Sequence, residues 1–293
     1  MTDDSPADVA LRGCVTRMQR SLDAKLNALS RSATPATLHS CRTQTRRLRA
    51  LLRSFRHAFN PAALARYENV LRHLTRDLGA ARSADVEQQL IARFAAEQCV
   101  PKDDGLEQLL AIAAQNRSRA VWDLKAKMSD DLWLRRLERL QRAASDPTLI
   151  VESRLSIAEM SARALRRRRR RLRRRLRARE RSPRALHRLR LKIKSLRYLL
   201  ECCAPYQAVV HAEMKQLRLL QDRLGELNDE WSLQRALAHQ RPYLRANVDI
   251  CAKLHSHRRE LMQCIDTHRK HLLRVWKQAP ADWARARHNS KAA

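Results

Sequence analysis

Apolar residues recur at intervals of three or four along most of the chain, which is the spacing of one face of an α-helix. Residues 7–29 illustrate the pattern, because Val15, Leu22 and Leu29 fall on one side of the helix that they predict. Only 4 Gly and 9 Pro interrupt a sequence rich in Leu, Ala and Arg, and this composition favours long helices over strands. The chain is therefore predicted to be all-α.

Capping and helix-ending residues divide the first half into helices. Thr34 or Thr37 can cap the second helix, close to a Pro that suits a helix start. Gly79 is interpreted as a C-terminal stop, with Ser83 or Asp85 capping the helix that follows. The expected helices cover about residues 7–29, a second segment up to 60, 62–78, a segment up to 98 and, after a loop at 99–105, a segment up to 128.

The second half is predicted to begin after Ser145-Asp-Pro147. Ser182 and Pro183 separate its first helix from its second, and Pro205 ends the second. Gly225 is interpreted as a stop, as Gly79 is. Helices are therefore expected from about residue 150, from 183 to 204, from 208 to 224, and through most of the remainder up to residue 280.

Two of the predicted helices carry the same row of polar residues at i, i+3, i+7 and i+10, which places each row on one helix face. A stripe of Leu and Ile borders each row. A solvated face has no reason to repeat its pattern, so the repeat predicts an internal duplication, with one helical bundle in residues 1–146 and another in 147–293. The first cation row is His39, Arg42, Arg46 and Arg49, and the second cation row is His187, Arg190, Lys194 and Arg197.

The charge of the chain indicates an anionic partner. Lys and Arg number 61 against 30 Asp and Glu, which gives a net charge of +31 and a pI near 11.3. Such an excess repels itself unless a polyanion supplies the counter-charge. The candidates are nucleic acid, an anionic membrane surface and a phosphate polymer, and the alternative is a generally basic protein without a specific partner.

The rows suit an extended chain of phosphates. Ten residues of helix span about 15 Å, and Arg and Lys bind phosphate oxygens as a planar fork and a point charge respectively. A single small anion would leave most of these cations without a counter-charge. Basic residues on neighbouring predicted helices are expected to turn towards the same site: Arg72, Arg218, Arg20, Lys25, Arg168 and Arg173.

The two His residues have two interpretations. Each imidazole can cap a helix start or bond a carboxylate; alternatively, each can bind the anion in its charged form. The second interpretation predicts tighter binding as the pH falls through roughly 6.5.

The sequence lacks the common signatures of enzymes and metal sites. No GxxxxGK[ST], HExxH, GxSxG or zinc-type Cys spacing occurs, and no paired carboxylates suit magnesium. His255-Ser-His257 and the pair His268 and His271 lack an acidic or Cys partner, so packing or solvated roles are expected. The sequence thus predicts a protein that is not an enzyme and that holds no metal or cofactor.

The cysteine content and the hydropathy of the sequence predict where in the cell the protein is located. The seven Cys are an odd set without CxxC, and the first residues are polar, which predicts reduced thiols in the cytoplasm. No apolar run is long enough to span a bilayer, so membrane insertion is not expected.

The motifs resemble those of the conserved histidine α-helical domain (CHAD) family. The first copy reads LHSCRTQTRRLR from Leu38 and LGAARSAD from Leu78, and the second LHRLRLKIKSLRY from Leu186 and LGELND from Leu224. The resemblance covers about residues 7–275. It implies two four-helix bundles related by a pseudo-twofold axis, with a basic groove or cavity between them.

The resemblance also implies a function, which is binding of inorganic polyphosphate without catalysis, with association with polyphosphate granules. Ser195 stands where the first copy has Arg47, and Ser83 stands where an acid is common in the family, which puts the orientation of Arg82 in question. The acidic Glu-x-Glu-x-Lys motif of the triphosphatase domain is absent, which implies a stand-alone binder. The ligand-facing set implied by position is His39, Arg42, Arg46, Arg47, Arg49, His187, Arg190, Lys194 and Arg197.

Nucleic-acid binding is the alternative function, because the charge alone allows it equally. Proteins that read bases usually add stacking aromatic residues or a recognition helix. Aromatic residues make up 4% of this chain, and Tyr198 is the one that lies within a cation row. The sequence therefore favours polyphosphate.

Overall fold

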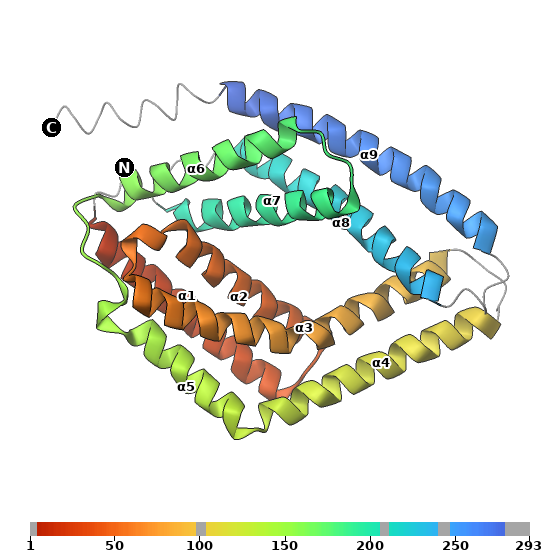
Figure 1. Ribbon diagram of the computed structural model, residues 1–293, viewed down its shortest axis with the longest axis horizontal. Coiled ribbons are helices and arrows are strands. Elements are labelled where there is room, and N and C mark those ends of the chain that lie inside the picture. Colours follow the sequence, from red (N-terminus) through yellow and green to blue (C-terminus); the bar gives the residue numbers. More distant parts are fainter. Residues whose placement is uncertain (1–4, 98–103, 206–210, 240–246, 279–293) are drawn as a thin grey trace. The chain divides into compact units, whose positions relative to one another are not determined.

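The structure of the chain is a computed structural model that describes residues 5–97, 104–205, 211–239 and 247–278. Within these ranges the chain forms nine α-helices and two short 3₁₀-helices and no β-strand, so the all-α prediction is confirmed (Figure 1). The chain divides into an N-terminal unit, Ser5–Arg154 with Ser232–Asp249, and a C-terminal unit, Leu155–Trp231 with the chain from Ile250. The division at residue 146, drawn from the repeated pattern, stays a prediction about the repeats.

Five helices make up most of the N-terminal unit: α1 (Ala7–Arg31), α2 (Pro35–Ser54), α3 (Pro61–Glu97), α4 (Asp104–Met128) and α5 (Asp131–Ser145). α3 is the central one, because α2, α4 and α5 all pack against it. Its Leu71, Leu74 and Leu78 are buried, as the helical spacing predicts. α1 packs on α2 and on α5.

The C-terminal unit consists of α6 (Ile157–Arg177), α7 (Pro183–Cys203), most of α8 (His211–His239) and most of α9 (Asn247–Gln278). α6 packs along α7. The buried carboxylate of Glu213 on α8 accepts hydrogen bonds from Arg169 Nε on α6 and from Trp276 Nε1 on α9, both at 2.8 Å. Three helices of this unit therefore meet at one buried ion pair.

Side-chain caps fix where several helices begin. Thr34 and Thr37 together form a capping box at the start of α2, and Ser182 caps α7, as the sequence predicts. α6, however, begins at Ile157 behind a capping box at Ser156, and the prediction of a helix from about residue 150 is wrong. The reason is tertiary, since Ile150 forms a β-bridge with Phe59 and so has extended backbone.

The predicted helix stops at Gly79 and Gly225 are also wrong. α3 and α8 each run as one helix through the glycine, and neither glycine has a positive φ. One helix was not predicted at all, because the sequence reasoning left residues 129–145 unassigned. Here Asp130 caps α5, since its side chain accepts a hydrogen bond from the backbone amide of Leu132 at 3.0 Å. Most of the loop predicted at 99–105, and the tail after residue 280, lie outside the described residues.

Candidate anion-binding site

The first cation row lies along α2, whose start is fixed by the capping box and by Pro35 at its first position. Leu38, Leu48 and Leu52 are buried and hold the adjoining side of the helix against the core. Among the row residues His39 is exposed, and Arg42, Arg46 and Arg49 are half-buried, as is their neighbour Arg47. The helix thus presents the row at the edge of its buried stripe.

Two arginines of the first cation row bind one position of α3. Arg42 Nη1 donates to the backbone oxygen of Thr75 at 3.3 Å, and Arg49 Nη1 donates to the Thr75 hydroxyl at 3.3 Å. Thr75 in turn donates to the Leu71 carbonyl at 2.7 Å, a bond that fixes its hydroxyl. Arg42 and Arg49 are two helical turns apart, so Thr75 determines how both guanidinium groups cross to α3.

Cations from α2 and α3 form a mutually repelling cluster. Burial, then Arg46 and then Arg82, lower the pKa of Arg42 to about 10. The pKa of Arg49 is also lowered, chiefly by burial, with Arg53, Arg72 and Arg46 acting in the same direction and Glu68 opposing them. Arginine side chains are charged at neutral pH, so the arginines of this cluster repel one another, and a bound anion would reduce that repulsion. We define the α2–α3 cluster as Arg42, Arg46, Arg49, Arg53, Arg72 and Arg82.

Arg82 is a member of this cluster that the sequence reasoning left out of the site. The predicted stop at Gly79 separated it from the helix that carries Arg72. Because α3 is continuous, Thr75 and Arg82 are seven residues apart and share one face of it. Recognition of a single long helix would have been the signal that places Arg82 beside the first cation row.

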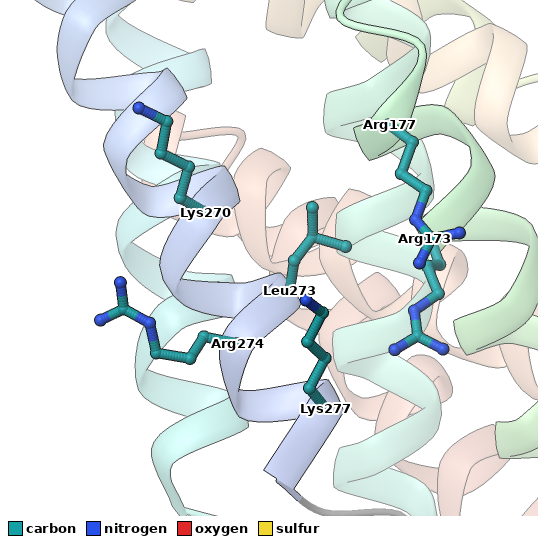
Figure 2. A pocket seen from close by; sticks show the side chains of 6 residues that line it. All are labelled: Arg173, Arg177, Lys270, Leu273, Arg274 and Lys277. Atoms are coloured by element: carbon teal, nitrogen blue, oxygen red, sulfur yellow. The ribbon is translucent and has the colours of Figure 1, made fainter.

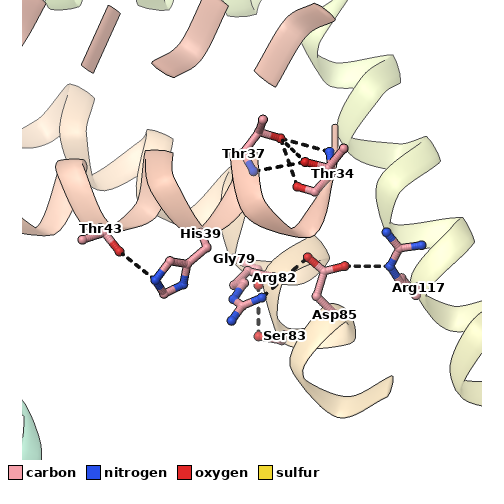
Figure 3. A network of polar contacts seen from close by, with 9 residues as sticks. All are labelled: Thr34, Thr37, His39, Thr43, Gly79, Arg82, Ser83, Asp85 and Arg117. Carbon is pink, nitrogen blue, oxygen red and sulfur yellow. Dashed lines mark hydrogen bonds and ion pairs between the residues drawn. The ribbon is translucent and has the colours of Figure 1, made fainter. Parts of the chain in front are cut away.

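Asp85 is an acidic neighbour of Arg82 on the same helix, but its hydrogen bond goes to Arg117. The buried carboxylate of Asp85 lies 3.9 Å from Arg82 Nη1 and accepts a hydrogen bond from Arg117 Nε on α4 at 2.8 Å (Figure 3). Ser83 instead donates to the Gly79 carbonyl at 3.0 Å. Neither residue caps a helix, contrary to the sequence prediction, because both lie inside α3.

Gly79 lies directly under the Arg42 guanidinium. A Cβ atom at Gly79 would be 3.5 Å from Arg42 Nη1, and a Cβ at Gly225 would be 3.6 Å from Arg190 Nη2. The two glycines therefore mark where the first arginine of each cation row packs against the next helix. These distances are ordinary van der Waals contacts, so a methyl group fits at either position, whereas a larger side chain would compete with the arginine for this space.

Two substitutions at Gly79 are expected to separate stability from binding. Gly79→Ala should leave phosphate-polymer affinity unchanged and raise the free energy of unfolding by up to about 1 kcal/mol, because Ala is the better helix former. Gly79→Leu should displace Arg42 and lower the affinity several-fold. Urea unfolding and titration calorimetry measure the two effects. Ala80→Leu, at an exposed neighbour on the same helix, is the matched control and should bind normally.

The second cation row lies along α7 and is tied to α8. His187 is exposed, and its Nδ1 lies 2.9 Å from the Asn228 side-chain oxygen. The imidazole of His39 contacts the hydroxyl of Thr43, with 3.4 Å between Nε2 and Oγ1. Asn228 lies three residues after Gly225, just as Arg82 lies three residues after Gly79. The second half therefore has the Asn228 amide, which contacts the His187 imidazole, where the first half has the Arg82 guanidinium.

Further along α7, Arg190 packs over Gly225, and Lys194 is half-buried beside it. Arg197 is balanced by Glu201, one turn further on, at 3.5 Å. Arg168 on α6 donates from Nη1 to the Ser195 hydroxyl at 2.9 Å. The structure thus brings Arg168 to the second cation row, at the position where the first half carries Arg47.

Of the remaining predicted site residues, Arg72 belongs to the α2–α3 cluster through its effect on the pKa of Arg49. Arg72 and Arg218 are exposed on α3 and α8, and Arg20 is exposed on α1. Lys25 donates to Ser21 of its own helix at 3.1 Å. Arg173 lines a groove with residues of α9. That the two cation rows face one common groove stays a prediction.

Other polar groups of the described residues are consistent with structural roles. Burial raises the pKa of the Cys41 thiol to about 11, and this thiol donates to the Lys25 carbonyl at 3.0 Å. His257 contacts the carboxylate of Glu230, an acidic partner that the sequence reasoning missed. No group of three or more potential metal ligands occurs in the described part of the chain, and none of its helices is long and apolar enough to cross a membrane.

Comparison with known proteins identifies the family. A search of curated proteins finds no match. The chain is similar in structure to the CHAD domain from the plant Ricinus communis, with a TM-score of 0.63 and 22% identity over 100% of this chain and 94% of that one. PptA from Streptomyces chartreusis gives a TM-score of 0.67 and 14% identity over 93% of this chain and 100% of that one. The model of the CHAD domain matches residues 10–238, so the chain belongs to the CHAD domain family.

Proposed function

We propose that this protein binds inorganic polyphosphate, a long linear polyanion, through its two cation rows and without catalysis. The observation that carries the proposal is the α2–α3 cluster, in which burial, and then the neighbouring Arg46 and Arg82, lower the pKa of Arg42 to about 10. Arginines placed so close together destabilise the empty site. A ligand with closely spaced negative charges removes that repulsion when it binds.

The shape of the cluster favours a chain over a single phosphate. Arg42 and Arg49 are seven residues apart on α2, which corresponds to about 10 Å along the helix. Both are held on α3 through Thr75, and Arg72 and Arg82 extend the cluster along that helix. Successive phosphates of one polymer can therefore meet successive guanidinium groups, each through charge-assisted hydrogen bonds.

No cofactor, metal or nucleophile enters this proposal. The protein's own side chains supply positive charge and hydrogen-bond donors, and binding leaves both the polymer and the protein chemically unchanged. In the cell we expect such a binder in the cytoplasm, associated with polyphosphate granules, as its family resemblance implies. Phosphate release on incubation with polyphosphate and divalent ions would contradict the non-catalytic part of the proposal.

Competition between polymers tests the proposal against nucleic-acid binding. Fluorescently labelled polyphosphate is bound to the protein and displaced with unlabelled polyphosphate or single-stranded RNA at equal phosphate concentration. We expect polyphosphate to displace the label far better than RNA, because the rows offer phosphate ligands and little for bases to stack on. Equal displacement by RNA would replace polyphosphate by nucleic acid as the ligand.

The imidazoles predict a pH dependence. The interpretation in which each imidazole binds the anion in its charged form predicts tighter polyphosphate binding at pH 5.5 than at pH 8. His39→Ala with His187→Ala should flatten this dependence while circular dichroism stays helical, since both side chains are exposed. Titration calorimetry across this pH range measures it. An unchanged pH profile in the double variant would assign both His to structural roles.

A further inference from the structure

The outward face of α6 carries a stripe of arginines that belong to neither cation row. They recur at i, i+4, i+7, i+11 and i+14, which places them on one side of the helix over about 21 Å. Each of them is exposed, whereas Leu165, Leu172 and Leu176 on the opposite side of the helix are buried. We define the α6 arginine stripe as Arg163, Arg167, Arg170, Arg174 and Arg177.

The stripe has no counter-charge among the described residues. Residues 160–179 contain no Asp or Glu, and within the described ranges no stripe arginine has a carboxylate oxygen within 4.0 Å. Like charges three and four residues apart destabilise a helix. The exposed Arg142 of α5 is by contrast paired with Glu138, one turn away. Because α6 is held by its capping box and by the buried pair of Arg169 with Glu213, the stripe is a fixed surface whose charge an external anion would balance.

The stripe belongs to α6 alone. Across a groove from α6, α9 presents Lys270 and Arg274, whose side chains point away from Arg173 and Arg177 (Figure 2). The cations of the two helices therefore do not surround a common space. A ligand of the stripe would lie along an open, straight helix face and would be contacted from one side.

An open, straight row of cations favours a rigid polyanion over a flexible one. A flexible phosphate chain has to be straightened against the helix, and the loss of its conformational freedom opposes binding. A nucleic-acid duplex is already straight, because its persistence length is about 50 nm, and it carries one negative charge per about 1.7 Å of its axis. α6 contains no aromatic residue, so the stripe offers no platform on which the unpaired bases of a single strand could stack.

A lipid surface fits the stripe less well than a duplex does. Helices that lie in a membrane interface bury an apolar face among the lipids. The apolar face of α6 is instead buried within the protein, and the exposed side of the stripe consists of arginines. The stripe could attract an anionic membrane by charge alone, without inserting into it.

We propose that the α6 arginine stripe is a separate interaction surface that binds the backbone of double-stranded nucleic acid without reading its bases. Arginine binds phosphate oxygens through charge-assisted hydrogen bonds that are often bidentate. Contacts of this kind position a protein on a duplex and carry no sequence information. The surface goes beyond the polyphosphate site proposed above, because its residues, its helix and its polymer are all different.

Fluorescence anisotropy with a short labelled DNA duplex tests the surface. The stripe variant, Arg170→Gln with Arg174→Gln and Arg177→Gln, removes three charges at i, i+4 and i+7. It should lower the duplex affinity by at least about tenfold at low salt. The slope of log K against log[salt] should fall by about 3, one for each phosphate contact that is lost. Lysine at the same three positions keeps the charge and should retain most of the affinity.

The matched control is Arg135→Gln with Arg139→Gln and Arg142→Gln, which removes three exposed arginines at the same spacing on α5. Circular dichroism should be helical in both glutamine variants, because Gln is nearly as good a helix former as Arg. The control should bind the duplex as the wild type does. Equal losses in the two variants would show that binding follows the total charge, and wild-type affinity in the stripe variant would also overturn the proposal.

Sedimentation with vesicles of phosphatidylserine and phosphatidylcholine tests the lipid alternative on the same proteins. We expect the stripe variant and the α5 control to sediment with these vesicles to the same extent, because each has lost three positive charges and neither has lost an apolar anchor. If the stripe variant alone loses vesicle binding while its duplex affinity stays that of the wild type, an anionic membrane replaces nucleic acid as the partner of the stripe.

The failure of this surface and the failure of the polyphosphate site can be told apart. Arg42→Glu with Arg190→Glu should abolish the binding of long polyphosphate and leave most of the duplex affinity intact, and the stripe variant should do the reverse. Loss of duplex binding in the Arg42 and Arg190 variant would show that the duplex uses the cation rows, and would overturn the stripe as a separate surface. If polyphosphate binding persists in that variant while the stripe behaves as expected, the cation rows are not the polyphosphate site.

Discussion

Replacing Arg42 and Arg190 by glutamate is expected to weaken the binding of long polyphosphate by at least about 100-fold. Each residue is the arginine that packs over a helix glycine in its unit, and each charge-assisted hydrogen bond to phosphate contributes about 1.5–3 kcal/mol. Reversal of the charge adds repulsion to that loss. Fluorescence anisotropy with labelled polyphosphate at several salt concentrations gives both the affinity and its salt dependence, and the latter should also become shallower.

The matched control for this prediction is Arg135→Glu with Arg139→Glu. It changes the net charge by the same amount at exposed positions of α5 that belong to neither cation row. If binding depends on the total charge alone, both variants lose the same affinity. A selective loss in the Arg42 and Arg190 variant assigns binding to the rows, whereas wild-type affinity in it excludes them.

The second large effect expected is on stability. Glu213→Leu should lower the free energy of unfolding of the C-terminal unit by about 3–5 kcal/mol, because it removes the carboxylate that pairs with the buried guanidinium of Arg169. It also removes the acceptor of the Trp276 indole N–H. Urea unfolding followed by circular dichroism measures the loss.

A double-mutant cycle separates the ion pair from packing. Glu213→Leu with Arg169→Met removes both charges and keeps apolar volume, so it should recover most of the lost stability. A double variant as unstable as the single one would show that lost packing, and not the unpaired charge, causes the effect.

The α2–α3 cluster illustrates a conflict between stability and binding. Burial and neighbouring cations lower the pKa of Arg42 and of Arg49, so their charged forms destabilise the folded protein when the site is empty. A polyanion that binds the folded protein but not the unfolded chain offsets this cost. It raises the free energy of unfolding by RT ln(1 + [L]/Kd), where [L] is the free ligand concentration. On the proposed function, polyphosphate should therefore raise the unfolding temperature of this protein.

Sequence reasoning succeeded where the signal is local. Helical periodicity predicted the all-α fold, and the Thr34 and Ser182 caps were predicted from residues within one turn of each helix start. Both cation rows were recognised for the same reason, since residues at i, i+3, i+7 and i+10 share a face whatever surrounds the helix. The motif resemblance was confirmed by the family match over residues 10–238.

The errors arose where a distant contact decides the local structure. Gly79 was expected to end a helix, but α3 is continuous and the glycine underlies Arg42, a residue of another helix. The region near Ile150 was expected to be helical, but it pairs with Phe59. In both cases the deciding partner lies far away in the sequence, where residue spacing carries no information about it.

The sequence by itself determined the all-α fold, the caps at Thr34 and Ser182 and the two faces that carry the cation rows, because hydrogen bonds within a helix and the 3.6-residue period depend on neighbouring residues alone. The tertiary structure decided which helices those faces meet. It placed Arg82 beside Arg42 and gave Arg169 a buried carboxylate. It also left Arg173 in a groove with the cations of α9. Packing between helices joins residues that are far apart in the chain, and only their positions in space show which charges are neutralised and which can bind a ligand.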